Sequence, residues 1–322
     1  MKAVVYPTYG PPDVLELQEI DKPTPQDNQV LVKVYAAAAN PLDWHRMRGA
    51  PFLVRLSDGL RKPKDPRLGA DIAGQVEAVG RAVTALRPGD AVFGEIGAGG
   101  FAEYVCVKET AVAPKPANLS YAEAAAAPVA AFTALQGLRD HGKLQSGQKV
   151  LINGASGGVG TFAVQMAKVF GAEVTGVCST RNLELVRSLG ADQVIDYTQT
   201  DFTKTGQRYD LIFDAVGNQS VAAYRRALTR QGIGVVAGFT TLARMLPIML
   251  FGSWGQQKIS AFLAHPNPSD LQAIKELLES GQVAPIIDRD YPLAKTTDAI
   301  RYLETGRARG KVIILVAEHA KG

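Results

Sequence analysis

The chain has 322 residues, a length that predicts two domains at roughly 150 residues each. Apolar residues make up 46% and charged residues 20%, which indicates a folded protein with a large core and excludes a disordered chain. The 35 basic and 31 acidic residues leave a net charge of +4, too small an excess to indicate binding to nucleic acid or to a membrane.

The number of cysteines and the length of the apolar runs exclude further classes of protein. The two cysteines, Cys106 and Cys178, are too few for a disulfide framework or a four-cysteine zinc site. The longest apolar stretches, Ala124–Phe132 and Met245–Phe251, are too short to span a bilayer. We therefore expect a protein that does not enter the membrane and that is located in the cytoplasm.

The first 115 residues predict a β-rich domain. They contain short runs rich in valine and aromatic residues, separated by Gly, Pro and Asp, and no helical period persists. The predicted strands are Ala3–Tyr6, Val30–Tyr35, Ile72–Val79, Ala91–Gly94 and Tyr104–Val107. The stretch Ala50–Leu68 is expected to be a long loop, or a loop with a short helix.

The pattern changes at Ser120, which with Glu123 forms a capping box. The alanine-rich segment that follows is predicted to be helical, with an interruption or kink at Pro128. Predicted strands and helices then alternate, which indicates a doubly wound parallel sheet. The strands are Val150–Asn153, Val174–Val177, Val194–Asp196, Leu211–Asp214, Ile233–Ala237 and Ile259–Leu263, and the helices are Val159–Phe170 and Leu183–Leu189.

Two helices and a strand are predicted after Pro266. One helix, Leu271–Leu278, begins behind a Ser269 cap, and the other lies around Thr297–Leu303. The last strand, Lys311–Val316, is expected to return to the first domain.

The strongest motif is the glycine-rich segment 150–160, which follows an apolar strand and opens an amphipathic helix. Gly157 would allow the backbone to approach a pyrophosphate, and Gly160 would allow close packing of the helix on the sheet. The free N–H groups and the dipole of the helix N-terminus favour a phosphate. Ala155 stands where the first glycine of the usual pattern would be. A glycine-rich turn without a ligand is the alternative.

The end of the second strand bears on the choice of dinucleotide. NAD sites usually have an acid there to bind the ribose 2′-hydroxyl, and the first acid in this region is Glu184. Ser179, Thr180 and Arg181 instead offer groups suited to a 2′-phosphate, which favours NADPH over NADH. The alternative is a helix cap followed by a solvated arginine.

A set of motifs across the whole chain resembles the medium-chain dehydrogenase/reductase superfamily, in its zinc-free quinone oxidoreductase (zeta-crystallin-like) branch. The motifs are residues 40–43 (NPLD), 68–74 (LGADIAG), 87–94 (RPGDAVFG), 100–104 (GFAEY), the 153–160 loop, 189–192 (LGAD) and 310–311 (GK). The resemblance implies an α/β protein of two domains, with a substrate cleft between them. Residues 1–124 and 266–322 would form a discontinuous GroES-like catalytic domain, and residues 125–265 a Rossmann domain that binds NADP(H).

The positions that match the catalytic zinc ligands of other members are Asn40, Ala70 and Val129, a set that does not suit zinc. Without a metal to polarise a simple carbonyl, a conjugated acceptor is the better substrate, because the incoming negative charge is delocalised onto oxygen. The resemblance therefore implies an NADPH-dependent, zinc-independent oxidoreductase that acts on quinones or α,β-unsaturated carbonyls. The alternatives are a zinc-independent alcohol dehydrogenase or enoyl reductase, and a non-catalytic NADPH-binding protein that interacts with RNA or another protein.

The resemblance also implies site residues. Asn40 would bind a substrate oxygen or the cofactor amide, His45 would donate a proton or line the pocket, and Asp43 would orient its loop. Proton delivery by water is the alternative. The expected cofactor-binding residues are Thr133, Gly154, Ala155, Ser156, Gly157, Gly158, Val159, Ser179, Thr180, Arg181, Tyr197, Ala215, Val216, Gly217, Gly238, Phe239, Phe262, Leu263 and Lys311.

The expected partners are a small-molecule substrate and a second copy of the chain. The resemblance implies a homodimer formed by edge pairing near Lys258–Leu263, where a bare strand would otherwise expose its backbone. Nucleic acid is not expected, because only Phe52 offers an aromatic ring within the basic 46–67 segment.

Overall fold

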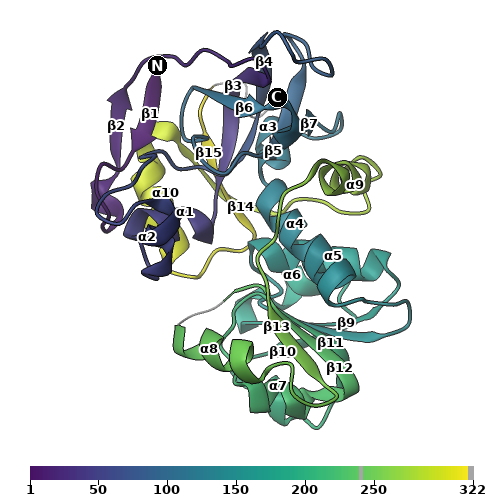
Figure 1. Ribbon diagram of the computed structural model, residues 1–322. Helices are drawn as coiled ribbons and strands as arrows, with labels where there is room; N and C mark the ends of the chain where they lie inside the picture. The colour runs from purple at the N-terminus through teal and green to yellow at the C-terminus, as the bar shows by residue number, and fades with distance from the viewer. Residues whose placement is uncertain (239–241, 318–322) are drawn as a thin grey trace. The chain divides into compact units, whose positions relative to one another are not determined.

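A computed structural model describes residues 1–238 and 242–317, and the side chains of residues 242–245 are outside this description. The chain forms two compact units (Figure 1). Unit 1 consists of Met1–Val129, Pro266–Glu279 and Pro285–Gly322, and unit 2 of Ala130–His265 and Ser280–Ala284. Residues 125–129, expected in the second domain, belong to unit 1, and Ser280–Ala284 belong to unit 2.

Unit 1 is built on a seven-stranded sheet in the order β14-β15-β3-β4-β5-β7, with β6 also paired to β3. A separate antiparallel pair, β1 and β2, completes its strands. The strands are β1 (Lys2–Val5), β2 (Glu16–Glu19), β3 (Gln29–Ala39), β4 (Asp71–Val79), β5 (Ala91–Glu95), β6 (Tyr104–Lys108), β7 (Val112–Pro114), β14 (Ile287–Pro292) and β15 (Lys311–Leu315). The helices are α1 (Pro41–Arg48), α2 (Leu53–Asp58), α3 (Tyr121–Ala125), α9 (Pro268–Glu279) and α10 (Thr296–Glu304).

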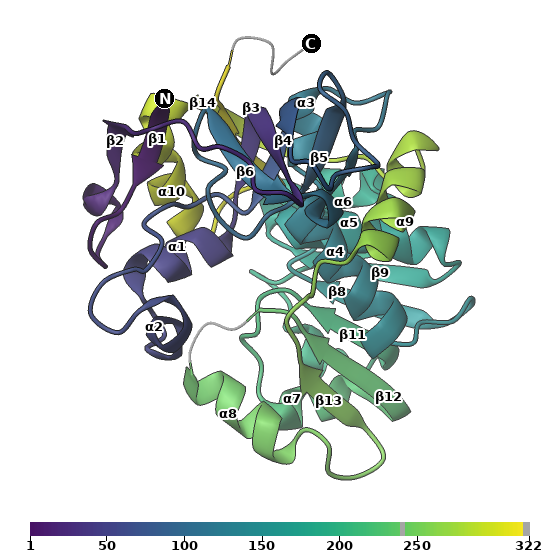
Figure 2. The same ribbon diagram turned by 45° about the horizontal axis from the view of Figure 1, so that its top comes forward.

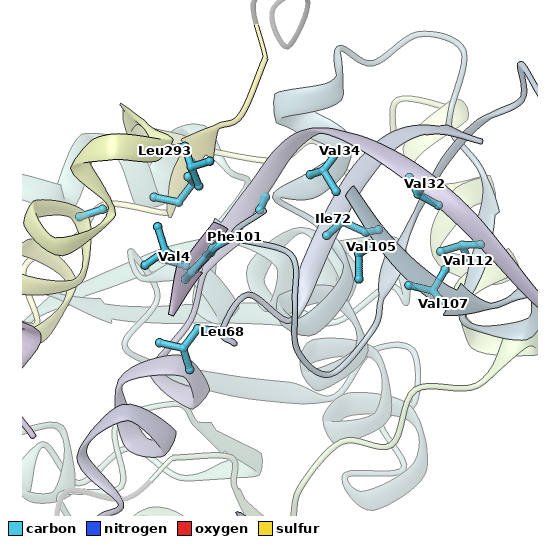
Figure 3. Packing of buried hydrophobic residues seen from close by; sticks show 14 of the residues in the cluster. Val4, Val32, Val34, Leu68, Ile72, Phe101, Val105, Val107, Val112 and Leu293 are labelled. Carbon is cyan, nitrogen blue, oxygen red and sulfur yellow. The ribbon is translucent and has the colours of Figure 1, made fainter. Parts of the chain in front are cut away.

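The last strand, β15, joins the seven-stranded sheet beside β3, so the end of the chain returns to the first domain, as the sequence predicted. Strand β15 pairs antiparallel with the carboxyl half of β3, so that Val312 faces Ala39 and Leu315 faces Ala36. The core of unit 1 consequently mixes residues from both ends of the chain. Figure 3 shows Leu293, from the C-terminal part, close to Val4 and Phe101 from the N-terminal part.

Unit 2 is a six-stranded parallel sheet in the order β10-β9-β8-β11-β12-β13. Its strands are β8 (Lys149–Asn153), β9 (Glu173–Cys178), β10 (Gln193–Asp196), β11 (Tyr209–Asp214), β12 (Leu228–Val236) and β13 (Lys258–Ala261). Its helices are α5 (Gly158–Val169), α6 (Leu183–Ser188), α7 (Val221–Ala227) and α8 (Leu242–Phe251), and α4 (Pro128–Gln136) begins at the boundary.

The strand order reverses direction at β8. From β8 the chain moves outward through α5 and α6 to β10, and from β11 it moves the other way through α7 and α8 to β13. Because such crossovers are right-handed, the two helix pairs cover opposite faces of the sheet, as Figure 1 shows. This is the predicted doubly wound Rossmann sheet, whose ligands bind at the carboxyl ends of the strands beside the reversal.

Helices α1, α7 and α8 were not predicted, and the predicted cap of α9 was wrong. The β-rich region contains helix α1, which was missed because it has no apolar period. The helix is instead specified at its ends: Pro41 fixes the first turn, the Asp43 carboxylate accepts the Asn40 N–H, and Gly49 ends the helix in the left-handed region. Helix α9 is capped by Asn267 and not by Ser269, because Asn267 Oδ1 accepts the Asp270 N–H at 2.9 Å.

The capping box at Ser120 is confirmed. Ser120 Oγ accepts the Glu123 N–H, and the Glu123 carboxylate accepts the Ser120 N–H. The break at Pro128 is also present, between α3 and α4. Within the described ranges, no helix combines the length and apolar character that crossing a bilayer would require.

Candidate active site

The glycine loop in unit 2 joins β8 to α5 at the carboxyl edge of the sheet (Figure 2). Gly154 has a φ of +81°, a backbone conformation that favours glycine. A Cβ on Gly160 would lie 2.0 Å from the Gly154 carbonyl oxygen, so only glycine allows the helix to approach the strand this closely. The loop geometry is therefore fixed by backbone constraints.

The start of α5 is open to a ligand. Its N-cap is Gly157, so no side chain caps the helix, and the first N–H groups of the helix lack partners within it. A Cβ on Gly157 would meet protein only at the Gly154 oxygen, 3.4 Å away. Space in front of unpaired amides at a helix N-terminus is the arrangement that binds a phosphate.

Three of the predicted cofactor segments meet at this edge. A Cβ on Gly154 would lie 2.8 Å from the Val216 side chain, and a Cβ on Gly238 would lie 2.5 Å from the Ala215 oxygen. Gly217 follows Val216 in the same turn. The sheet thus brings the glycine loop together with residues 215–217 and Gly238.

Asp214, which sequence reasoning did not single out, builds the 215–217 turn. Its buried carboxylate accepts the N–H groups of Val216 at 2.7 Å and Gly217 at 2.8 Å. The other oxygen accepts from Asn153 Nδ2 at 3.0 Å and from the Tyr224 hydroxyl at 2.8 Å. The four bonds compensate for burial of the charge and lock the turn beside the glycine loop. An aspartate at the end of a buried strand was the available signal.

A buried amide next to the loop is incompletely bonded. Asn182 Nδ2 donates to Ser156 Oγ at 2.8 Å and lies 3.3 Å from Ser179 Oγ. Its Oδ1 atom is buried without a hydrogen-bond partner in the described part of the chain. Because a buried acceptor without a donor costs free energy, a ligand hydroxyl at this position would be stabilising.

An acid that the sequence reading did not use lies beside the end of the second strand, β9, because Asp196 on the neighbouring strand pairs with Cys178. The Thr180 hydroxyl donates to Asp196, the last residue of β10, and both residues contact Thr198. These hydroxyl bonds hold the pKa of the Asp196 carboxyl below its ordinary value. Thr180 is therefore engaged. Arg181 and Tyr197 lie on the surface, and Tyr197 is 61% exposed.

Four further predicted cofactor residues have different surroundings. Thr133 lies on α4 and is half-buried. The Phe262 ring packs on His141, with 4.4 Å between ring centroids, and Leu263 beside it is 73% exposed. Phe239 lies outside the described residues.

Lys311, also expected at the cofactor, belongs to a buried polar cluster in unit 1. Its ammonium donates to Asn40 Oδ1 at 2.5 Å and to Asp71 Oδ2 at 3.1 Å, and Asn40 Nδ2 donates to the same Asp71 oxygen at 2.9 Å. All three side chains are at most 3% exposed. The remaining Asp71 oxygen accepts the Val129 N–H at 2.8 Å.

The Asn40 amide is fully occupied by this cluster. Besides Asp71 and Lys311, it contacts the Ala38 carbonyl through Nδ2 at 3.1 Å. Both N–H bonds and the carbonyl oxygen are thus used inside unit 1. The amide holds the Lys311 ammonium in place and has no N–H left for a substrate oxygen.

Asp43 orients its loop, as the sequence reading suggested for it. One carboxylate oxygen accepts the Asn40 N–H at 2.8 Å and the other accepts the Gly69 N–H at 2.9 Å. Burial raises the pKa of Asp43 to about 6, although the two backbone bonds act in the opposite direction. Asp43 fastens the start of α1 to the segment 68–70, which leads into β4.

His45 is a poor proton donor in this arrangement. Its Nδ1 lies 2.7 Å from the Ala50 carbonyl oxygen, which only accepts, so we assign the hydrogen to Nδ1. Burial lowers the pKa of His45, which favours the neutral ring. In that tautomer Nε2 carries a lone pair that can accept a hydrogen bond. The ring also stacks on Trp44, with 3.7 Å between centroids.

Glu95 was missed by sequence reasoning. It ends β5 directly opposite Asp71 on β4, so the two side chains lie on the same face of the sheet. Burial, followed by the negative charge of Asp71, raises the pKa of Glu95 to about 8, against the opposing charges of Lys311 and Arg46. Nothing in the sequence distinguishes it from other strand-end acids, because the shift arises from the fold.

The positions that match zinc ligands in related enzymes hold no such set here. Asn40 is bonded to Lys311, Ala70 is buried and Val129 contributes its backbone N–H to Asp71. The Lys311 ammonium already supplies a positive charge to Asp71. In residues 1–238 and 242–317, no group of three or more His, Cys, Asp or Glu side chains is arranged to hold a metal ion.

Comparison with known proteins assigns the family. Residues 26–117 match the alcohol dehydrogenase GroES-like domain, and residues 189–314 match a family described as zinc-binding dehydrogenase. The chain is 40% identical to the 2-methylene-furan-3-one reductase of Solanum lycopersicum and 37% identical to the chloroplastic NADPH-dependent alkenal/one oxidoreductase of Arabidopsis thaliana. Each alignment covers 98% of this chain and 79% of the relative.

A solved structure supports the same assignment. The quinone oxidoreductase from Coxiella burnetii superposes with a TM-score of 0.87 at 33% identity, over 98% of this chain and 99% of the other. The chain belongs to the medium-chain dehydrogenase/reductase superfamily, in its quinone oxidoreductase branch. The predicted family and fold class are confirmed, and the protein is an oxidoreductase of this superfamily.

We expect Lys311→Met to lower the free energy of unfolding of unit 1 by roughly 3–5 kcal/mol, because Asp71 would keep a buried charge without a partner. Adding Asp71→Asn should restore part of that loss, since the charge is removed and the Val129 bond can remain. The measurement is urea unfolding in a Trp254→Phe background, where Trp44 alone reports on unit 1. The exposed Lys108→Met is the control. A double variant no more stable than Lys311→Met would contradict this account.

Glu95 should make unit 1 less stable as the pH rises. Its pKa is about 8 in the folded chain against an ordinary 4.5, so the folded state binds more protons between these values. The contribution of Glu95 to the free energy of unfolding is fully present below pH 4.5 and is lost by about pH 8. In the same fluorescence assay, the decline between pH 6 and 8 should be smaller in Glu95→Gln than in the parent. The exposed Glu19→Gln should leave it unchanged, and identical profiles for Glu95→Gln and the parent would refute the assignment.

Proposed function

We propose that the protein is an NADPH-dependent, zinc-independent oxidoreductase that reduces quinones or α,β-unsaturated carbonyls. The observation that carries this proposal is the Lys311 ammonium, held by Asn40 and Asp71 at the place where zinc-dependent relatives have a metal ligand. A site arranged in this way lacks the ligands for a Lewis acid. The reductases and quinone oxidoreductase to which the chain is similar are named for conjugated acceptors, which supports the same substrate class.

The residues of unit 2 suit a nicotinamide dinucleotide. The uncapped amides at the start of α5 would hold the diphosphate, and the unpartnered Asn182 oxygen would accept from a ribose hydroxyl. Ala155, Ser156, Gly158 and Val159 would contribute through their place in the same loop. When bound, the nicotinamide supplies a hydride.

Because the coenzyme supplies the hydride, the reaction requires only one further transfer, that of a proton. Hydride arrives at the β-carbon of an enone, the π electrons move to the carbonyl oxygen, and a proton completes the α-carbon. With His45 neutral and the Asn40 amide engaged, we propose that water delivers this proton. Asn40 and Asp43 then act as positioning residues, and His45 accepts a hydrogen bond from substrate or water.

Preference for NADPH rests on Arg181, together with Ser179 and, by the family resemblance, Tyr197. Asp196 opposes this preference, because its carboxylate would repel a 2′-phosphate. The relative named as NADPH-dependent supports the choice of cofactor. Thr180, bonded to Asp196, would reach the phosphate only by exchanging that bond.

The activity is tested with four substrates. 9,10-Phenanthrenequinone, a 2-alkenal and a simple aldehyde are assayed with NADPH, and a primary alcohol is assayed with NADP⁺. We expect kcat/KM for the quinone or the alkenal to exceed that for the aldehyde and the alcohol by at least about tenfold, a difference of roughly 1.4 kcal/mol. Dialysis against a chelator should leave kcat unchanged. Faster alcohol oxidation, or loss of activity on chelation, would reject the proposal, and tight NADPH binding without turnover would indicate a binding protein.

Arg181→Ala should raise the dissociation constant for NADPH by about tenfold and that for NADH by less than about twofold, because only NADPH carries the 2′-phosphate. Asp196→Asn should strengthen NADPH binding, since it removes a repelling charge. Calorimetric titration of both coenzymes measures these effects. Arg187→Ala, whose guanidinium pairs with Glu184 instead, is the matched control. Equal losses for both coenzymes in Arg181→Ala would show that this arginine does not read the phosphate.

We also propose a homodimer in which β13 pairs with its copy, as the family resemblance implies. Strand β13 is an edge of the sheet, and the neighbouring surface exposes Leu246, Met249, Leu250 and Trp254. A solution mass equal to that of a single chain would exclude it. We propose a cytoplasmic location on the sparse cysteine usage alone, and fractionation of cells that express the protein would test it.

A further inference from the structure

An open, basic pocket lies at the opposite edge of the unit 2 sheet from the glycine loop. It has a volume of about 560 Å³ and is lined by Arg208, Arg225, Arg230, Gln256 and Gln257, a group that we call the arginine pocket. Arg208 precedes β11, Arg230 lies near the start of β12, and the two glutamines precede β13. Figure 1 shows these neighbouring strands, with α7, which carries Arg225, beside them. The volume is in the range of small-molecule sites.

The pocket is formed by three guanidinium groups and no acid. In the described part of the chain, none of the three forms an ion pair. Many other arginines do, such as Arg48 with Glu304 and Arg67 with Asp65. Like charges placed together repel one another, so the group would be stabilised by a bound anion.

Neutral partners hold the three guanidiniums in place. Arg225 donates from Nη2 to the carbonyl oxygens of Phe251 at 2.9 Å and Trp254 at 2.6 Å. Arg208 Nη1 donates to the Leu228 carbonyl at 2.9 Å, and Arg230 Nε donates to Gln256 Oε1 at 2.6 Å. A guanidinium has five N–H groups, so each arginine keeps at least three for a ligand.

Gln257 fastens the floor of the pocket. Its Nε2 lies 2.9 Å from the Arg225 carbonyl oxygen, 3.1 Å from that of Leu228 and 3.0 Å from that of Thr229. These contacts fix the backbone where α7 passes directly into β12, between Arg225 and Arg230. The backbone from which Arg225 and Arg230 extend is therefore fixed before any ligand arrives, which lowers the entropy cost of binding.

The chemistry of the lining selects a ligand rich in acceptor oxygens. Phosphate groups match guanidinium forks in charge and geometry. No aromatic ring lines the pocket, so there is no surface on which a base would stack. Strand β11 alone separates the two edges by six residues, about 20 Å at 3.3 Å per residue, so this ligand is not the diphosphate at the glycine loop.

We propose that the arginine pocket binds a small polyanion with two or more linked phosphate groups. The shared chemistry is a phosphate chain, supplied by an inorganic polyphosphate or by a nucleoside triphosphate. The site uses no residue of the proposed reaction, so it stands or falls independently of that reaction.

The test is calorimetric titration of the full chain with inorganic triphosphate, in the presence of saturating NADPH so that the glycine loop is filled. We expect one site per chain. Arg208→Gln and Arg230→Gln should each weaken binding by about tenfold or more, because each removes a charged donor. The matched control is Arg226→Gln, on the same helix as Arg225 but outside the lining, where Arg226 Nε donates to the Thr203 carbonyl. It should change the affinity by less than about twofold, and NADPH affinity should be equal in all variants.

Two further titrations are made. ATP identifies the source of the phosphate chain, and a single-stranded RNA tests nucleic acid as the alternative ligand. ATP that binds more tightly than inorganic triphosphate, with the same losses in Arg208→Gln and Arg230→Gln, would assign the site to nucleotides, and equal affinities would assign it to the phosphate chain alone. The proposal is overturned if triphosphate gives no heat, if the two variants bind like the parent, or if orthophosphate binds equally well. It is also overturned if a single-stranded RNA binds these arginines more tightly than triphosphate.

Discussion

The buried ion pair between Lys311 and Asp71 is the contact on which unit 1 depends. It joins residues 240 positions apart and connects the start of β15 with the start of β4, while Asn40 at the end of β3 bonds to both. Transfer of these charges from water is compensated only because every polar atom of the cluster has a partner. Val129 and Asp43 extend the same network to the start of α4 and the start of α1.

The two units differ in the polar groups that they place at the candidate site. Unit 2 presents backbone amides, and its glycines are specified by contacts that leave no space for a Cβ, as at Gly160. Unit 1 presents side chains whose protonation depends on one another. Glu95 and Asp43 each interact electrostatically with the Asp71 carboxylate and the Lys311 ammonium, and burial raises the pKa of both acids.

Much of the fold could be predicted from the sequence, because the signals that specify it are local motifs or periodic patterns. The glycine loop, the capping box at Ser120 and the alternation after it predicted the parallel sheet, and motifs along the chain predicted the family. Helix α1 was missed because its signal lies in Pro41, Asp43 and Gly49 and not in an apolar period.

The buried polar cluster of Lys311, Asp71 and Asn40 could not be predicted from the sequence in this way. Lys311 was assigned to the cofactor, and its buried partners Asp71 and Asn40 are distant in the sequence. Glu95 and Asp214 acquire their roles from strand pairing and burial. Asp196 comes next to Thr180 only because β10 pairs with β9. Such properties depend on three-dimensional neighbours, which a single sequence does not reveal.

The discontinuous arrangement of unit 1 has a consequence for biosynthesis. The carboxyl half of β3 pairs with β15, so Ala36–Ala39 emerges from the ribosome long before Val312–Leu315 does. At roughly 5–20 residues per second, that edge stays without its native neighbour for tens of seconds. The continuous segment 130–265 is complete earlier, so the nascent chain carries a finished Rossmann sheet while an apolar strand edge waits, a window in which a holding chaperone would matter.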